Sequence, residues 1–278
     1  MSDPIPKDGY VLIIGAMKCG TSSLYSYLSE HPKICPACAK EPEFFSEYQS
    51  HGVKVDDYTD LWAFDTSVHR YALEASTGYT KYPTESNVAR NIFKFGIDPK
   101  FIYIIRNPFE RITSHFSFQQ IDSEWNLDID DDHLIYASNY FLQLEQYRKF
   151  FSMDNILLLD FDDLVQVPQE TLTKVYNFLG ILSDCFPTRY EVKNATESQS
   201  QLQRRIRSSR FGRWLGYVPS PIRQLGKRAL PHSSTTKQQL TAAQHEYVYN
   251  ALSADMAQLQ QVYGFDVRKW GFEASVSA

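Results

Sequence analysis

A short loop bounded by glycines carries the side chains in this sequence that are most suited to holding an anion. It follows the apolar run 10–14 and reads Gly15-Ala16-Met17-Lys18-Cys19-Gly20-Thr21-Ser22-Ser23. Small residues let a backbone approach an anion closely, and the amide groups at the start of a following helix point at it. Thr21 and Ser22 would add hydroxyl donors. The pattern predicts a cradle for a phosphate-type group, with Lys18 beside it.

The position of the lysine separates this loop from the P-loop of nucleotide hydrolases. That loop has a glycine directly before its lysine and a Ser or Thr directly after it, whereas Lys18 stands two positions before Gly20. The spacing disfavours a kinase or an ATPase. However, the apolar run 156–159 leads into Asp160, as a magnesium-binding Walker B strand would. A nucleoside-triphosphate-dependent kinase therefore stays the alternative enzyme, and a non-catalytic nucleotide-binding module is a third possibility.

Arg106 and Ser114 form a second candidate anion site. Arg106 leaves the apolar run 101–105, and ligands of open α/β sheets bind at the carboxyl ends of strands. Ser114 lies about two turns into a helix that Asn107 would cap and Pro108 would begin. An arginine and a hydroxyl suit one phosphate monoester, although the arginine could instead pair with a surface carboxylate. Two such sites indicate a ligand with two separated anionic groups.

A third segment offers a candidate base. It reads Lys40-Glu41-Pro42-Glu43-Phe44-Phe45, and proline and aromatic neighbours could partly desolvate the Glu41 carboxylate for general base chemistry. An ordinary surface glutamate is the alternative. His115, next to Ser114, is a possible second base.

The elements around these segments predict one α/β domain over residues 1–278. Continuous apolar runs at 10–14, 101–105 and 156–159, with a shorter one at 71–74, indicate strands buried on both faces. Helical patterns lie between and after them, at 21–28, 133–151, about 169–179 and 241–264. We expect a mostly parallel central sheet with helices on both faces and a P-loop-like donor site.

Composition narrows the class of protein. The net charge of -5 over 278 residues argues against a nucleic-acid binder. Residues 1–9 hold no apolar run, and no stretch nears the ~20 apolar residues that a membrane helix needs, so we expect a cytoplasmic protein that does not span a membrane. Cys35 and Cys38 have the spacing of half a zinc site without a second half, which favours free thiols and no metal.

Taken together, the three motifs resemble the sulfotransferases that use PAPS (3′-phosphoadenosine 5′-phosphosulfate), in particular the branch with heparan-type and bacterial members and the sulfotransferase domains of polyketide-type synthases. The family's Lys-x-Gly-Thr-Ser loop is matched at 18–22, its Arg and Ser eight residues apart at 106 and 114, and its Lys-Glu-x-x-Phe-Phe segment at 40–45. The resemblance extends over residues 10–182, through segments 74–79, 161–164 and 178–180.

The resemblance implies a role for each motif. Lys18 would bind the bridging oxygen of the phosphosulfate and stabilise the leaving phosphate of the product PAP. The 5′-phosphosulfate would be held by Cys19, Gly20, Thr21, Ser22 and Ser23, and the 3′-phosphate by Arg106 and Ser114. Glu41 would take the proton of the acceptor, with His115 as the other candidate. No metal is needed, and Lys237 is the candidate for the late loop that closes over the donor.

The sequence defines the acceptor less well than the donor. Heparan 3-O members carry His and Asp where this chain has Glu43 and Ser46, so the resemblance does not extend to that acceptor. A carbohydrate, a lipid, or a β-hydroxyacyl chain on a carrier protein all fit the family. Residues 204–228 contain eight Lys or Arg and no acid. They predict either a solvated face that also contacts the donor, or a docking surface for an anionic partner.

Overall fold

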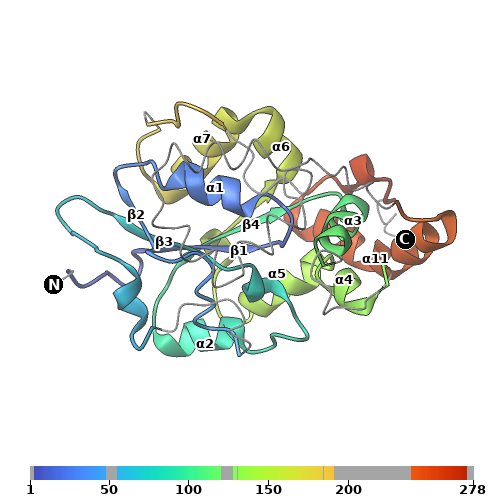
Figure 1. Ribbon diagram of the computed structural model, residues 1–278, viewed down its shortest axis with the longest axis horizontal. Helices are drawn as coiled ribbons and strands as arrows, with labels where there is room; N and C mark the ends of the chain where they lie inside the picture. Colours follow the sequence, from blue (N-terminus) through green and yellow to red (C-terminus); the bar gives the residue numbers. More distant parts are fainter. Residues whose placement is uncertain are drawn as a thin grey trace, which may run out of the picture.

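A five-stranded sheet, with every strand parallel to its neighbours, forms the centre of the fold (Figure 1). The computed structural model describes residues 3–47, 55–119, 128–129, 131–183, 185–190 and 239–273. The order of the strands is β2-β3-β1-β4-β5. Their bounds are β1 Tyr10–Gly15, β2 Ile34–Pro36, β3 Tyr71–Ala75, β4 Lys100–Ile105 and β5 Ile156–Asp160.

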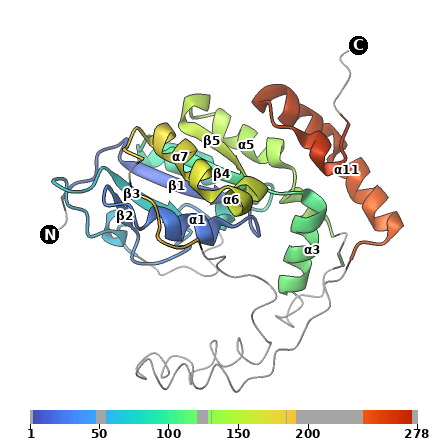
Figure 2. The same ribbon diagram turned by 90° about the horizontal axis from the view of Figure 1, so that it is seen from above.

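Helices cover both faces of this sheet, as the sequence predicted. One face carries α1 (Thr21–Leu28), α6 (Phe161–Gln166) and α7 (Pro168–Leu179), and the other carries α2 (Val88–Phe95) and α5 (Tyr140–Arg148) (Figure 1). Three more helices, α3 (Pro108–Gln119), α4 (Asp132–Tyr136) and α11 (Ala242–Tyr263), gather at one end of the molecule (Figure 1), and Figure 2 shows α3 and α11 from above. The part of the chain that the structure describes also contains short 3-10 helices, namely η1 (Tyr58–Leu61), η2 (Thr77–Thr80), η3 (Met153–Asn155) and η6 (Val267–Trp270).

Burial of the two central strands explains why they read as unbroken apolar runs. Residues 10–14 of β1 and 101–105 of β4 have at most 2% of their surface exposed. A strand covered by helices on both faces has no solvent-facing side to alternate with. After β1 the chain continues to β2 at one edge of the sheet, and after β4 it continues to β5 at the other edge. In such folds, ligands bind at the carboxyl ends of the two strands between which this direction reverses.

Helix boundaries follow the capping residues that the sequence offers. The Asn107 side chain accepts the N–H of Phe109 at 3.0 Å at the start of α3, and Thr241 forms a capping box with Gln244 at the start of α11. The expected helix at 133–151 is instead two helices, because residues 137–139 interrupt it. Among the strands and α-helices, β2, α2 and α6 were not predicted, and neither were the 3-10 helices. The single-domain boundary of 1–278 stays a prediction.

Asp255 connects α11 to the start of α5. Its carboxylate accepts the N–H of Phe141 at 2.9 Å and that of Leu142 at 2.8 Å. Burial raises the pKa of this carboxyl from the ordinary 3.8 to about 7, although the two N–H bonds act in the opposite direction.

Replacing Asp255 by Asn should therefore remove a pH dependence of the free energy of unfolding. Since the folded pKa is raised, the stability that the protonated carboxyl contributes is complete below about pH 4 and is lost as the pH rises through about 7. Between pH 5 and 7 the difference between wild type and Asp255→Asn should change by up to about 1.4 kcal/mol per pH unit. Urea denaturation at several pH values measures it, and parallel stability curves would contradict this assignment.

Candidate functional site

The loop between β1 and α1 depends on glycine at position 20. Gly20 has φ 83° and is the residue before the first turn of α1. A Cβ added there would lie 3.0 Å from the ring of Phe161, so both the backbone conformation and the close approach require glycine. The first amide groups of a helix have no partner inside it. The loop thus brings the N-terminus of α1, with Thr21 and Ser22, to the carboxyl end of β1.

Lys18 leaves this loop toward α3. It has φ 71°, and its Nζ lies 4.5 Å from the centroid of the Phe118 ring. Phe118 and Ser114 are one turn apart on α3 and therefore share a face. The structure thus brings Lys18 to the helix face that carries Ser114.

Cys19 points in the opposite direction, into the core. It is fully buried, its Sγ lies 3.8 Å from the carbonyl oxygen of Met17, and its N–H donates to the carbonyl of Ala16 at 3.1 Å. Burial raises the pKa of the thiol to about 12. The Cys19 side chain therefore supports the loop from inside, and a ligand contact by Cys19, which stays a prediction, would have to come from its backbone.

Arg106 follows β4 and pairs with a carboxylate, the alternative that the sequence left open. Its Nε lies 3.1 Å and its Nη2 2.5 Å from Oε2 of Glu110, one turn along α3. The guanidinium also lies over the ring of Phe161, 4.5 Å from its centroid. The Glu110 side chain is 56% exposed, whereas that of Arg106 is 19% exposed. Because water reaches the glutamate, the pair is worth about 1 kcal/mol, and a phosphate dianion can displace Glu110.

Lys40 links the candidate base to the donor loop. Its Nζ donates to the Ser22 hydroxyl and lies 3.3 Å from Oε1 of Glu41. Oε2 of Glu41 accepts the hydroxyl of Thr77 at 3.3 Å, and the Glu41 side chain is 25% exposed. Sequence reasoning assigned no role to Lys40 or Thr77. No sequence pattern signals a contact between residues 18 or 36 positions apart.

His115 is buried and engaged by Arg111. Only 2% of its surface is exposed, and the Arg111 Nη1 donates to its Nδ1 at 3.1 Å. A guanidinium can only donate, so Nδ1 is the acceptor and the ring proton sits on Nε2. Burial, together with the Arg111 charge, holds the pKa of His115 well below its ordinary value. The neutral ring therefore has its one basic nitrogen already occupied, which favours Glu41 over His115 as the base.

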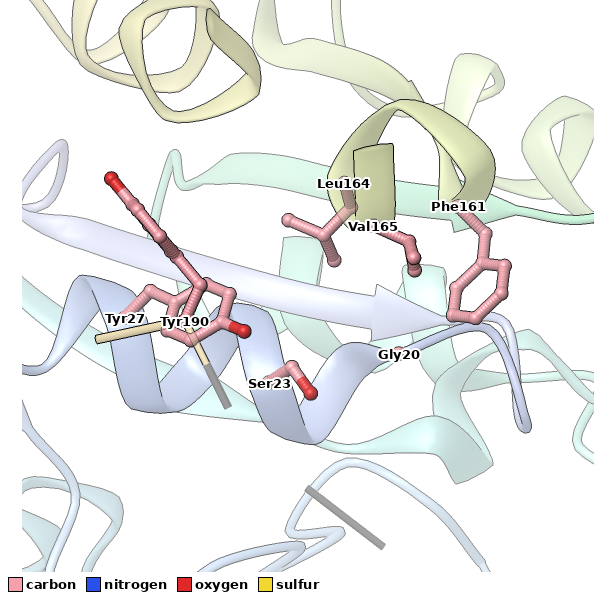
Figure 3. A pocket seen from close by; sticks show the side chains of 7 residues that line it. All are labelled: Gly20, Ser23, Tyr27, Phe161, Leu164, Val165 and Tyr190. Carbon is pink, nitrogen blue, oxygen red and sulfur yellow. The ribbon is translucent and has the colours of Figure 1, made fainter. Parts of the chain in front are cut away.

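Figure 3 shows a hollow beside the donor loop, between α1 and α6. Ser23, the last of the predicted loop contacts, lies here and is 5% exposed. The walls are mostly apolar or aromatic and are formed by Gly20, Ser23, Tyr27, Phe161, Leu164, Val165 and Tyr190. A flat, largely apolar group attached to a ligand in the donor loop would fit against them.

Asp160, the residue that suggested a Walker B strand, is already bonded. One oxygen accepts the N–H of Asp162 at 2.9 Å at the start of α6, and the other forms an ion pair with Lys269.

In the described ranges, no three His, Cys, Asp or Glu residues are placed to hold a metal ion together. All four cysteines are free. No helix among those residues has the length and apolarity to span a membrane. Lys237 and residues 204–228 lie outside the described residues.

Comparison with known proteins finds a family and several similar chains. The model of the family described as "Sulfotransferase domain" matches residues 8–214. The chain is 33% identical over 164 residues to the membrane-associated sulfotransferase kil1 of Dictyostelium discoideum, covering 53% of this chain and 34% of that protein. It is 25% identical over 187 residues to human heparan sulfate glucosamine 3-O-sulfotransferase 5, covering 61% of this chain and 53% of that protein. The chain thus spans between a third and about half the length of these relatives.

The fold is shared with a solved structure. A sulfotransferase from Alicyclobacillus acidocaldarius superimposes with a TM-score of 0.68 at 20% identity, covering 96% of this chain and 100% of that chain.

The pairing of Arg106 with Glu110 leads to a test of the second anion site. Because Glu110 competes for the guanidinium, Glu110→Gln should tighten the binding of PAP about two- to fivefold, the equivalent of up to about 1 kcal/mol. Isothermal titration calorimetry gives the Kd. Glu145→Gln is the matched control, since it breaks a similar pair with Arg148 (2.5 Å) on α5. Equal tightening in both variants, or weaker binding in Glu110→Gln, would argue against the site.

Proposed function

The chain belongs to the sulfotransferase domain family, and from this premise we propose that it transfers a sulfuryl group from PAPS to an acceptor hydroxyl and releases PAP. The observation that carries the proposal is the bridge made by Lys40. Its ammonium contacts both the Glu41 carboxylate and the hydroxyl of Ser22 in the predicted anion-binding loop. A transfer of this kind needs a base close to the donor cradle, so that the acceptor hydroxyl can lie between the two.

On the donor side, the loop residues hold charge. The Lys18 ammonium binds the oxygen that bridges phosphate and sulfuryl group, and it stabilises the charge that develops on the leaving phosphate. Gly20 and Thr21 offer amide groups, and Ser22 and Ser23 offer hydroxyls. Arg106 and Ser114 take the 3′-phosphate once Glu110 releases the guanidinium. The ring of Phe161, which lies under Arg106 and lines the hollow beside Gly20, packs against the base of the nucleotide.

On the acceptor side, Glu41 removes the proton. The acceptor oxygen attacks sulfur, the bond from sulfur to the bridging oxygen breaks, and the acceptor's proton passes to the Glu41 carboxylate. The bond from Thr77 and the ion pair with Lys40 orient that carboxylate in the meantime. A base near the reacting hydroxyl contributes about 10²- to 10⁴-fold in rate. The acceptor is a hydroxyl of a carbohydrate, a lipid, or a β-hydroxyacyl chain on a carrier protein, and turnover with labelled PAPS separates these classes.

Binding of PAP tests the donor assignment. PAP should raise the melting temperature of the protein, while ATP with Mg²⁺ should raise it less, because ATP carries no 3′-phosphate for Arg106 and Ser114. Differential scanning fluorimetry measures both shifts. A shift with ATP-Mg²⁺ and none with PAP would favour the kinase alternative. If Lys18→Met binds PAP but still turns over at the wild-type rate, Lys18 has no catalytic role.

Two substitutions distinguish the candidate bases. Glu41→Gln should lower kcat by about 100-fold or more and leave the Kd for PAP nearly unchanged, because the main loss is proton removal and the half-exposed ion pair with Lys40 is worth at most about 1 kcal/mol. Glu47→Gln, an exposed glutamate six residues further on, is the matched control and should keep wild-type activity. His115→Gln should lower thermal stability, since His115 is buried and bonded to Arg111, and should reduce kcat less than Glu41→Gln does. The reverse order of the two effects would assign the base to His115.

A further inference from the structure

The carboxylate of Glu74 is buried directly behind the segment that carries Glu41. Glu74 lies near the end of β3, pairs in register with Leu12 of β1, and has 0% of its surface exposed. A buried carboxylate is costly unless hydrogen bonds satisfy it. Glu74 obtains these bonds from the side-chain hydroxyls of three residues, namely Tyr58, Ser76 and Tyr79.

The direction of these bonds matters, because a hydroxyl has a single proton. Tyr58 donates its proton to Oε2 of Glu74, and Ser76 donates its own to Oε1 at 2.6 Å. The lone pairs of the hydroxyl oxygens then remain for other donors. Ser76 Oγ accepts the N–H of Glu43 at 3.0 Å, and the Tyr79 oxygen accepts the N–H of Phe45 at 3.4 Å. Glu74 thus orients the hydroxyls that hold the backbone of residues 43–45.

Residues 41–45 need such support because their backbone is strained. Glu41 has φ 52° and Glu43 has φ 48°, a region that residues other than glycine occupy at a cost. The N–H of Glu41 donates to the carbonyl of Ala75, next to Glu74, at 3.1 Å. This segment therefore keeps its conformation through bonds to the end of β3 and the residues that follow it.

We propose that Glu74 is a positioning residue for Glu41. Its carboxylate sets the direction of the Ser76 and Tyr79 hydroxyls, these fix the backbone of residues 43–45, and that backbone aims the Glu41 side chain at the acceptor. This rests on the proposed function, in which Glu41 takes the acceptor's proton. Glu74 itself touches no substrate and acts only through the segment in front of it.

Glu74→Gln tests the proposal with a side chain of the same shape. The amide nitrogen of Gln must donate, so at least one hydroxyl has to turn its proton toward the loop, where an N–H already points. We expect kcat to fall about ten- to a hundredfold, as for a slightly displaced catalytic group. The Kd for PAP should stay within twofold of wild type. Hydrogen exchange of a peptide covering residues 43–47, followed by mass spectrometry in the PAP complex, should become faster.

A double variant separates positioning from general destabilisation. If Glu74 acts only through Glu41, then Glu41→Gln/Glu74→Gln should be no slower than Glu41→Gln alone. Asp255→Asn is the matched control, because it also replaces a buried acid that accepts hydrogen bonds, and it should leave kcat unchanged. Should Glu74→Gln not fold, Ser76→Ala removes the link to Glu43 and should show the same fall in kcat and the same faster exchange.

Several results would overturn the proposal. They are an unchanged kcat in Glu74→Gln, a parallel loss of PAP affinity, or full additivity with Glu41→Gln. Failure of the proposed function has a different signature, since the wild type would then bind no PAP or transfer no sulfuryl group. In that case the exchange of residues 43–47 still decides whether Glu74 fixes this segment, and unchanged exchange in Glu74→Gln would refute it.

Discussion

The parallel pairing of β1 with β4 is the constraint on which the site depends. Ile13 lies opposite Ile102 and Gly15 opposite Tyr103, so both strands end at the same edge of the sheet. The anion-binding loop and Arg106 leave the sheet at that edge, next to one another. Because both strands are buried on both faces, a shift of register would move every side chain out of its packed position and is strongly opposed. Packing of the core therefore sets the separation of the two candidate anion-binding positions.

Two kinds of charged group surround this edge, and their partners differ. Arg106 and Lys40 are partly exposed and pair with the neighbouring carboxylates of Glu110 and Glu41. Such pairs are weak, so they keep the basic side chains in place and yet can be exchanged for a ligand. Arg111 and Glu74 are fully buried and bond to neutral groups instead. They cannot be exchanged without leaving a buried charge unsatisfied, and they form the fixed frame of the site.

The sequence predicted the parts of this protein that obey local rules. Continuous apolar runs predicted β1 and β4, which are buried on both faces, and also β5, an edge strand whose first three residues are half-buried. β2 was not predicted because it has only three residues and ends in Pro36. α6 was not predicted because it follows β5 with no intervening turn residues. At the candidate site, the motifs predicted roles for Lys18, Arg106 and Glu41. The inward direction of Cys19 and the engagement of His115 by Arg111 depend on packing between distant elements, which no local pattern records.

Packing between distant elements also affects which residues can contact the acceptor. Glu43 occupies the position at which the resemblance to heparan 3-O members ends, and it is 1% exposed. A Cβ on Gly78 would lie 2.6 Å from Oε1 of Glu43, so the glycine lets this side chain fold back against η2. A side chain held there cannot reach an acceptor, whereas Glu41, two residues earlier, is 25% exposed. If Glu41 is the base, as we propose, the contacts that select the acceptor come from other elements around it, and the inward turn at position 43 serves the geometry of that base.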